Sequence, residues 1–278
     1  GGMSDSAARL VKARDLLRMA VSSAALSHPL AEHTLPMNKD ILVVGGGVTG
    51  MNAALRLAGK GYKVFLVERS GELGGVAGGI RRTLEGEDVQ AYMRDLKKRV
   101  QDHDRIQVLL NAVIVDHSGM PGMFKTGLQI GPRLAYRQIS HGATILATGA
   151  PPRRPEVYLL DEHEAVVTQL DLDGLLEDRS AEVRAWRNVV MIQCVGSRCE
   201  DNPNCSRVCC QSAVKNALRV LDANPEARVF VLYRDMRTYG FQEDFYREAR
   251  ERGVVFVHHE PEDAPEVEPA GNRVKVTF

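Results

Sequence analysis

A glycine-rich turn directly after a short apolar run constrains the fold of this chain more than any other feature. The run at 41–44 leads into GGGVTG at 45–50 and then into a segment with helical spacing that Gly61 ends. A second apolar run follows at 62–68. This order of strand, turn, helix and strand is typical of parallel strands joined by a right-handed crossover. The sequence therefore predicts a Rossmann-like unit.

The glycines are spaced as a dinucleotide phosphate turn requires. Gly45 permits the tight turn, Gly47 lets the backbone approach a pyrophosphate, and Gly50 lets the helix pack closely on the strand. The first helical turn then offers free N–H groups to phosphates. Glu68 ends the next strand, where its carboxylate can accept hydrogen bonds from ribose hydroxyls, and a turn kept only for packing leaves this residue unexplained. We predict a dinucleotide site whose turn is formed by Gly45, Gly46, Gly47, Val48, Thr49 and Gly50.

Further segments extend the α/β pattern over the rest of the chain. A helix is predicted at 91–103, an antiparallel meander at 112–140 and a buried strand at 143–149. After a proline-rich stretch, a second series of strand, helix, strand, helix and strand follows. The predicted fold class is therefore α/β with two Rossmann-like units. The predicted domains are residues 1–38 (a tag remnant, a helix at 6–27 and a linker), 39–150 (the first Rossmann-like domain) and 151–278 (the second).

The charge balance and the apolar pattern exclude several classes of function. Lys plus Arg and Asp plus Glu number 36 each, so no net charge attracts the chain to nucleic acid or to an acidic membrane surface. No apolar run approaches the roughly 18 residues that a membrane span needs. The polar start does not read as a signal peptide, so we expect a cytoplasmic location. In that compartment, clustered cysteines more often bind metal or perform redox chemistry than form structural disulfides.

All of the cysteines lie close together in the second unit, and no CxxC pair occurs among them, although zinc ribbons and thioredoxin-like dithiols both favour one. Cys209 and Cys210 are adjacent and cannot easily form an unstrained disulfide with each other. A [4Fe–4S] cluster needs thiolates that converge, which a long loop before the predicted helix at 212–221 can supply. From the residues alone, the iron–sulfur, zinc and dithiol interpretations stay open. The chain's cysteines are Cys194, Cys199, Cys205, Cys209 and Cys210.

The cysteine loop lies where a second phosphate turn is expected. The strand at 189–195 is followed by Gly196 as the lone glycine of a long loop. A dinucleotide turn needs several glycines at fixed spacing. We therefore predict no ordinary NAD(P) site in the second unit.

The first unit resembles the two-dinucleotide-binding-domain flavoproteins. The segment from Glu68 to Gly75 matches their ExxxxxGG extension, and Ala147-Thr148-Gly149 resembles their second signature. The resemblance implies a thioredoxin-reductase-like fold that binds FAD, with an adenine contact at the start of the meander. Besides the glycine turn, the residues that it implies for FAD binding are Glu68, Arg69, Gly74, Gly75, Val113, Ala147, Thr148 and Gly149.

Nearly the whole chain resembles the A-subunit family of heterodisulfide reductase. The segments that carry the resemblance are KARDLLRMAV, GGGVTGMNAAL, IQCVGSR, NPNCSRVCC, AVKNAL and LYRDMRTYG, of which CSRVCC is highly specific. This family implies an FAD and iron–sulfur oxidoreductase component that takes part in electron transfer, in some members by flavin-based electron bifurcation. Its [4Fe–4S] ligands correspond to Cys194, Cys205, Cys209 and Cys210, and it implies no role for Cys199, which we interpret as a surface thiol.

The resemblance also implies partners and a longer protein. The partners are other subunits of a heterodisulfide reductase-type complex and hydrogenase or dehydrogenase electron donors, and the full protein is expected to form a homodimer. Family members return to the FAD domain after the second unit, whereas this chain stops at Phe278 and begins with a tag-like Gly-Gly. We therefore expect a truncated fragment that can be inactive by itself, and we assign it no catalytic residue. A dithiol-using pyridine nucleotide–disulfide oxidoreductase and a non-catalytic docking fragment stay open as alternatives.

Overall fold

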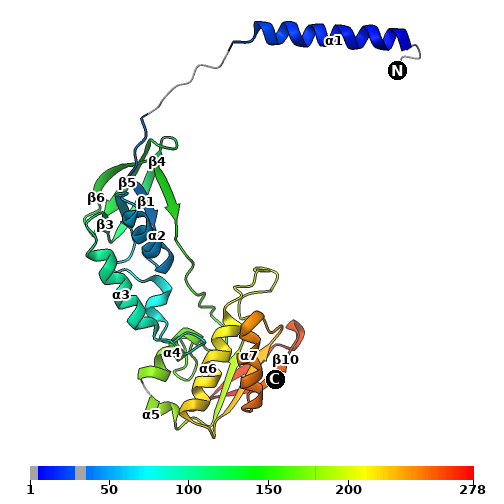
Figure 1. Ribbon diagram of the computed structural model, residues 1–278. Helices are drawn as coiled ribbons and strands as arrows, with labels where there is room; N and C mark the ends of the chain where they lie inside the picture. Colours follow the sequence, from blue (N-terminus) through cyan, green and yellow to red (C-terminus); the bar gives the residue numbers. More distant parts are fainter. Residues whose placement is uncertain (1–5, 29–35, 179) are drawn as a thin grey trace. The chain divides into compact units, whose positions relative to one another are not determined.

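The computed structural model describes residues 6–28, 36–178 and 180–278 (Figure 1). Contacts divide the chain into residues 1–37 and residues 38–278. The first part contains α1 (Ser6–Leu26), which confirms the helix predicted there. Most of the predicted linker lies outside the described residues. Among the described helices, none is long and apolar enough to cross a membrane. The domain boundary predicted at residue 150 stays a prediction.

Parallel strands form the first sheet, in the order β3-β2-β1-β7. The aliphatic runs predicted the central strands because a parallel sheet is buried on both faces, and Leu42, Val43, Val64 and Leu66 are fully buried. Asp88 begins α3 by accepting a hydrogen bond from the Ala91 N–H. The elements are β1 (Ile41–Val44), α2 (Val48–Gly59), β2 (Val64–Val67), η1 (Gly75–Gly79), α3 (Val89–Gln101), β3 (Ile106–Leu109) and β7 (Ala143–Leu146).

An antiparallel meander connects β3 to β7, as predicted. Its strands are ordered β4-β5-β6. Leu128 is fully buried and packs with Leu42 and Phe65 of the first sheet, so the meander shares part of its core. The strands are β4 (Ala112–Ser118), β5 (Phe124–Ile130) and β6 (Ala135–His141).

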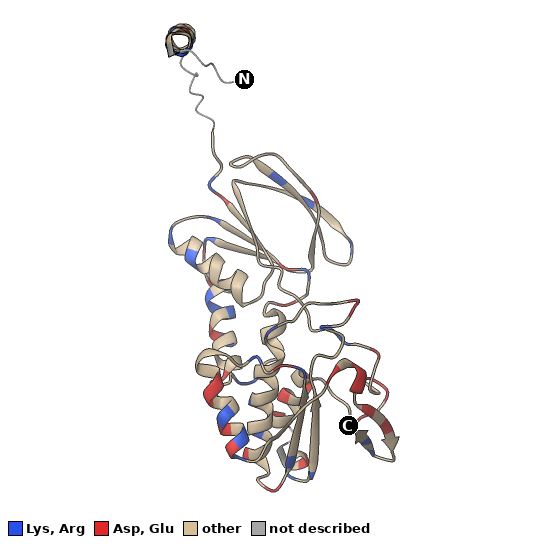
Figure 2. Ribbon diagram, turned by 90° about the vertical axis from the view of Figure 1, so that its right-hand side faces the viewer, with Lys and Arg blue, Asp and Glu red and all other residues tan. Residues whose placement is uncertain are grey.

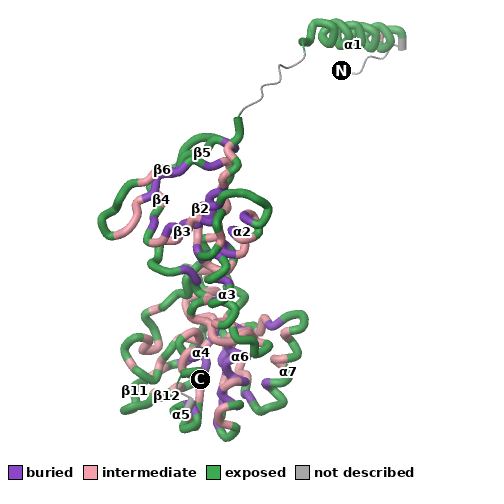
Figure 3. The backbone as a smooth tube through the Cα atoms, turned by 60° about the vertical axis from the view of Figure 1, so that its left-hand side comes forward, coloured by how far each residue is buried: buried purple, intermediate pink, exposed green. Residues whose placement is uncertain are grey.

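A second parallel sheet has the order β10-β9-β8. Its central strand buries Val229 and Val231 completely. The helix α6 packs against this sheet and is the most continuously buried helix of the second unit (Figure 3). The elements are β8 (Asn188–Ile192), α6 (Cys209–Ala223), β9 (Arg228–Tyr233), η2 (Gly240–Gln242), α7 (Glu243–Glu251) and β10 (Val255–His258).

Several elements differ from the sequence prediction. The helix predicted at 212–221 begins at Cys209, so the adjacent cysteines lie in its first turn. The stretch before β8, interpreted only as polar, contains helices because Leu172, Leu176 and Val183 pack into the second core. The acidic segment before the last strand pairs with it as a hairpin, where Asp and Glu gather (Figure 2). These elements are α4 (Gln169–Asp178), α5 (Ser180–Val183), η3 (Pro261–Asp263), β11 (Glu266–Ala270) and β12 (Arg273–Thr277).

A buried ionic cluster joins the segment after η1 to α4 and α6. Asp173, with a side chain only 1% exposed, accepts hydrogen bonds from the Arg81 N–H at 2.6 Å and from Lys215 Nζ at 2.9 Å. Arg219 also pairs with Asp173. Lys215 donates a further hydrogen bond to the Arg82 carbonyl at 3.0 Å. Burial lowers the pKa of Lys215, and the Asp173 carboxylate opposes this shift. The ionic cluster therefore fixes α6 against a segment that follows the glycine turns.

Candidate cofactor sites

The glycine turn after β1 has the backbone geometry that its sequence predicts. Gly45 has a φ of 109°, and a Cβ added there would lie 2.2 Å from the Ala147 carbonyl oxygen. A Cβ on Gly50 would lie 1.9 Å from the Gly45 carbonyl oxygen. No described atom comes within 4 Å of a Cβ added to Gly47, which caps α2. The turn is therefore tightly packed at its two ends and open at the helix N-terminus.

Glu68 is fixed by hydrogen bonds at the end of β2. Its Oε2 accepts from the Gly46 N–H at 2.6 Å. Its Oε1 accepts from the N–H and the hydroxyl of Ser70, at 2.8 and 2.9 Å. Burial acts to raise the pKa of Glu68, but these hydrogen bonds outweigh burial and hold the pKa below its usual value. An ionised carboxylate therefore lies beside the open part of the turn, as a ribose contact requires.

The diglycine and the second signature join the same edge of the sheet. The Gly74 N–H donates to the Gly46 carbonyl at 2.9 Å, and a Cβ on Gly75 would lie 3.3 Å from Gly47 Cα. The Ala147 N–H donates to the Val44 carbonyl at 2.8 Å. Gly149 has a φ of 61° and no described atom within 4 Å of an added Cβ. Segments far apart in the sequence therefore meet at the carboxyl edge of the first sheet.

The remaining predicted FAD contacts surround this edge. The Ala112 N–H donates to the Glu68 carbonyl at 2.9 Å, which holds the start of β4 beside Glu68. Val113 is the next residue of β4, and its side chain is exposed. Arg69 and Thr49 are exposed, and Thr148 lies between Ala147 and Gly149. The open backbone at the glycine positions and the ionised Glu68 fit a dinucleotide. The assignment of each residue to FAD stays a prediction.

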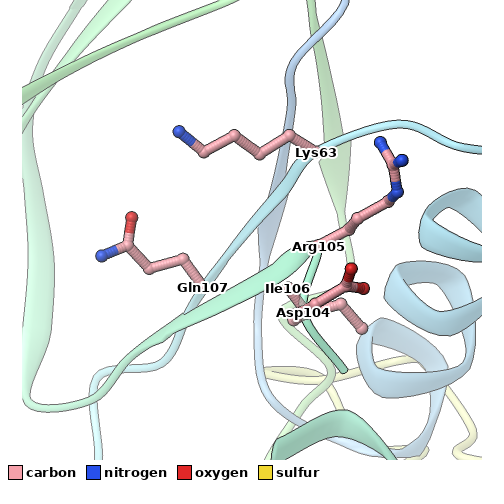
Figure 4. Close-up of a pocket in the computed structure, with 5 residues that line it drawn as sticks. All are labelled: Lys63, Asp104, Arg105, Ile106 and Gln107. Carbon is pink, nitrogen blue, oxygen red and sulfur yellow. The ribbon is translucent and has the colours of Figure 1, made fainter. Parts of the chain in front are cut away.

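A shallow hollow lies at the opposite edge of the same sheet (Figure 4). Lys63 precedes β2, and Asp104 and Arg105 precede β3, so these residues lie at the amino edge. In open α/β sheets, ligands bind at the carboxyl ends of the strands. We therefore assign the hollow no part in cofactor binding.

The cysteine loop connects β8 to α6. Cys194, Arg198 and Arg207 have positive φ values of 62°, 56° and 64°, so the loop turns sharply along its length. Arg153 Nη1 donates to the Gly196 carbonyl at 2.8 Å, and Arg234 Nη1 donates to the Arg198 carbonyl at 2.6 Å. Arginines from outside the loop therefore hold its backbone.

The thiols at the start of α6 are electrostatically linked. A hydrogen bond from the Cys210 thiol lowers the pKa of Cys209 to about 6, against the effect of burial. The same hydrogen bond, with burial, raises the pKa of Cys210. Cys210 Sγ also lies 3.6 Å from the Asp235 carbonyl oxygen, which is a second acceptor within reach of the same thiol hydrogen. Cys205 Sγ accepts from the Arg207 N–H at 3.3 Å, whereas Cys199 is exposed. The hydrogen bond between the two thiols therefore favours the thiolate form of Cys209 over that of Cys210.

The chemistry of these donors fits an iron–sulfur cluster, because thiolates are its usual ligands. All of the cysteines are free thiols. Within the described residues, however, no three Cys, His, Asp or Glu side chains lie in an arrangement that could hold a metal ion. The predicted ligand set, which is Cys194, Cys205, Cys209 and Cys210, stays a prediction.

The contacts of Arg153 and Arg234 with the cysteine loop were missed by the sequence prediction. The sequence makes residues 234–239, which follow a strand, a candidate surface for a substrate or partner, with structural pairing of their charges as the alternative. Arg198 Nη2 pairs with Asp235 Oδ2 at 2.6 Å, so part of this charge is structural. The position of Arg234 directly after β9 is a usable signal, because strand ends of a parallel sheet share one edge.

Replacement of Glu68 by glutamine is expected to lower the free energy of unfolding by about 1–2 kcal/mol at pH 7, because a neutral amide accepts hydrogen bonds less strongly. Folding lowers the pKa of Glu68, so the ionised Glu68 carboxylate stabilises the folded protein. This contribution is present above the pKa that Glu68 has in the unfolded chain, and it is lost as the pH falls through the pKa that Glu68 has in the folded protein. Urea unfolding at pH 7 and at a pH below about 4 measures the difference. Glu72→Gln, which changes a side chain 85% exposed, is the control. An equal effect of E68Q at both pH values would contradict this account.

A comparison with protein families matches a large part of the chain. The family described as pyridine nucleotide-disulphide oxidoreductase matches residues 17–119 and, in an overlapping match, residues 39–192.

The curated relatives described next are both named as A subunits of heterodisulfide reductases. The A subunit of the H(2):CoB-CoM heterodisulfide,ferredoxin reductase of Methanothermobacter marburgensis is 26% identical, over 92% of this chain and 52% of its own length. The iron-sulfur A subunit of the CoB--CoM heterodisulfide reductase of Methanocaldococcus jannaschii is 24% identical, over 93% of this chain and 53% of its own length. The resemblance predicted from the motifs is confirmed, and the chain spans about half the length of these relatives.

Solved structures confirm the predicted fold class. The thioredoxin reductase of T. acidophilum superposes with a TM-score of 0.54 at 12% identity, over 84% of this chain and 68% of its own. The thioredoxin reductase of Lactococcus lactis gives a TM-score of 0.52 at 16% identity, over 86% of this chain and 73% of its own. The arrangement of both sheets is therefore thioredoxin-reductase-like.

Proposed function

Because this chain belongs to the pyridine nucleotide-disulphide oxidoreductase family, we propose that it is an electron-transfer flavoprotein module of a heterodisulfide reductase-type complex. Its cofactors in this proposal are FAD at the carboxyl edge of the first sheet and a [4Fe–4S] cluster on the cysteine loop. When bound, FAD would supply two-electron chemistry and the cluster one-electron chemistry. Flavin-based electron bifurcation is one form of electron transfer that this pair of cofactors allows.

The observation that carries this proposal is the replacement of a second phosphate turn by thiols. The loop between β8 and α6 contains Gly196 as its lone glycine and ends with Cys209 and Cys210 in the first helical turn. A helix N-terminus stabilises negative charge, and it lowers the pKa of thiols placed there. The same position that suits a phosphate therefore suits thiolate ligands. This supports exchange of electrons with a protein-bound centre in preference to NAD(P)H.

The roles proposed for the first unit follow from its backbone. The open N–H groups at the start of α2 bind the pyrophosphate, because the Gly47 position leaves room for it. Glu68 accepts from the ribose hydroxyls. Gly74, Gly75 and Gly149 let the chain pass close to the flavin half of the cofactor.

The proposed partners are the other subunits of such a complex and a hydrogenase or dehydrogenase that donates electrons. The relatives are named as components of heterodisulfide reductases, and this chain covers about half of each. We propose a homodimer for the longer protein and a cytoplasmic location.

Anaerobic purification of the full 278-residue chain tests the proposal. We expect one FAD per chain, measured by absorbance after release, together with about four iron and four sulfide, as a [4Fe–4S] cluster requires. Stoichiometric zinc without iron would contradict the cluster. Formation of a dithiol on addition of NADH, without iron, would support the dithiol alternative instead.

Replacement of Cys210 by serine is expected to remove most of the bound iron, because a hydroxyl is a poor substitute for a thiolate ligand. Cys199→Ser is the matched control, since Cys199 is exposed and outside the proposed ligand set. Iron and sulfide are assayed in both variants, with FAD content as a second measurement. Equal loss of iron in the two variants would contradict the ligand assignment.

A further inference from the structure

Buried polar atoms without partners gather near the cysteine loop. Within the part of the chain that the structure describes, Gln193 Nε2, Arg198 Nη1 and Arg234 Nε are buried and have no hydrogen-bond partner. Gln193 as a whole is only 4% exposed. A buried donor that stays unpaired costs about 1–3 kcal/mol. Several unpaired N–H donors in one region therefore indicate an acceptor that the protein itself does not provide.

The topology brings these donors to one edge of the second sheet. Gln193 follows β8 and Arg234 follows β9, and both strands run parallel. The register pairs Ile192 with Leu232, and the Gln193 N–H donates to the Leu232 carbonyl at 2.9 Å. Cys194 comes two residues after β8 and Arg234 comes directly after β9, so both lie at the carboxyl edge of the sheet. The carboxyl edge of the sheet therefore combines a thiol with unpaired donors.

Further contacts connect the donors to sulfur. The Arg198 side chain hydrogen-bonds to Cys194, and its Nη2 holds Asp235 at 2.6 Å. The backbone N–H of Arg237 hydrogen-bonds to Cys210. Arg234 Nη1 donates to the backbone carbonyl of Arg198 at 2.6 Å, which joins the Arg234 guanidinium to the cysteine loop. The side chain of Arg198 and the backbone of Arg237 therefore contact two cysteines of the proposed ligand set.

We propose that Gln193, Arg198 and Arg234 are positioning residues that donate hydrogen bonds to the sulfur atoms of the cluster and thereby raise its reduction potential. This inference rests on the proposed function. Reduction adds one electron and breaks no bond, so the anionic group becomes more negative by one charge. Hydrogen-bond donors and cationic guanidinium groups stabilise that state more than the oxidised one.

Redox titration of the anaerobically purified full chain with dithionite, followed by electron paramagnetic resonance, tests the inference. Gln193→Leu removes the donor at similar volume. We expect it to disfavour reduction about tenfold, which is a negative shift of about 59 mV for a one-electron couple. Arg198→Met removes a donor and a charge, and we expect a larger negative shift. Arg198→Lys restores the charge and should recover part of it.

The control is Arg228→Met, which removes a charge from the exposed start of β9, at the opposite edge of the sheet. Its potential should equal that of the unsubstituted chain. Unshifted potentials in Q193L and R198M, with iron content retained, would overturn the inference and leave the proposed function standing. Absence of iron from the unsubstituted chain would overturn both. If Q193L loses its iron, a potential in R198K equal to that of the unsubstituted chain overturns the inference and a negative shift supports it.

Discussion

Replacement of Gly50 by alanine is expected to destabilise the first Rossmann-like unit and to abolish FAD binding. The added Cβ would lie 1.9 Å from the Gly45 carbonyl oxygen, and backbone on both sides must then move. Forcing extra atoms into a packed site typically costs about 1–3 kcal/mol, and more where the backbone is displaced. Urea unfolding measures the loss of stability, and equilibrium dialysis against FAD measures the loss of binding.

Matched glycine substitutions separate binding from folding. Gly59→Ala at the end of the same helix adds a Cβ with no described atom within 4 Å, so neither stability nor binding should fall. Gly47→Ala also leaves the fold intact, but its Cβ occupies the space proposed for the pyrophosphate. We expect G47A to lose at least about tenfold in FAD affinity, which is about 1.4 kcal/mol. A free energy of unfolding in G50A equal to that of the unsubstituted chain would contradict the packing argument. An FAD affinity in G47A equal to that of the unsubstituted chain would contradict the phosphate site.

Replacement of Asp173 by alanine is expected to lower the free energy of unfolding by about 3–5 kcal/mol. The substitution removes the carboxylate that accepts from Lys215 at 2.9 Å and from the Arg81 N–H at 2.6 Å. A buried charge left without its partner is strongly destabilising. Thermal and urea unfolding of the full chain measure the effect.

Asp178→Ala is the control for this prediction. Asp178 lies on the same helix and pairs with Arg81 at 2.9 Å, but its side chain is 59% exposed. Exposed ion pairs contribute about 0–1 kcal/mol. A second substitution, Lys215→Met, should restore part of the stability lost in D173A, because it removes the unpaired charge. Equal effects of D173A and D178A would show that burial does not govern this ionic cluster.

The sequence was sufficient to predict the first unit because its determinants are local. The spacing of Gly45, Gly47 and Gly50, followed by Glu68, indicates both a backbone path and a ligand class. The structure adds contacts that no local pattern contains, such as the packing of Gly75 against Gly47 at 3.3 Å. These contacts arise from tertiary structure, which joins residues far apart in the chain.

Other features could not be predicted for the same reason. β11 contains Pro269 and alternating glutamates, so only its pairing with β12 makes it a strand. Asp173 and Lys215 lie far apart in the chain, so no local pattern in the sequence pairs them. The unpaired donors after β8 and β9 become visible only once the strands are aligned.

The helix α6 has a consequence for spacing within the second unit. Its first turn carries Cys209 and Cys210, and the next turns carry Lys215 and Arg219, which anchor it to Asp173. An α-helix rises about 1.5 Å per residue, so α6 fixes the distance between the two thiols and the basic residues that pair with Asp173. Insertions in the loop before Cys205 would lengthen that loop but would not change this distance. We expect loop length to vary freely among chains of this kind, whereas the number of residues between the cysteine pair and the anchor should not.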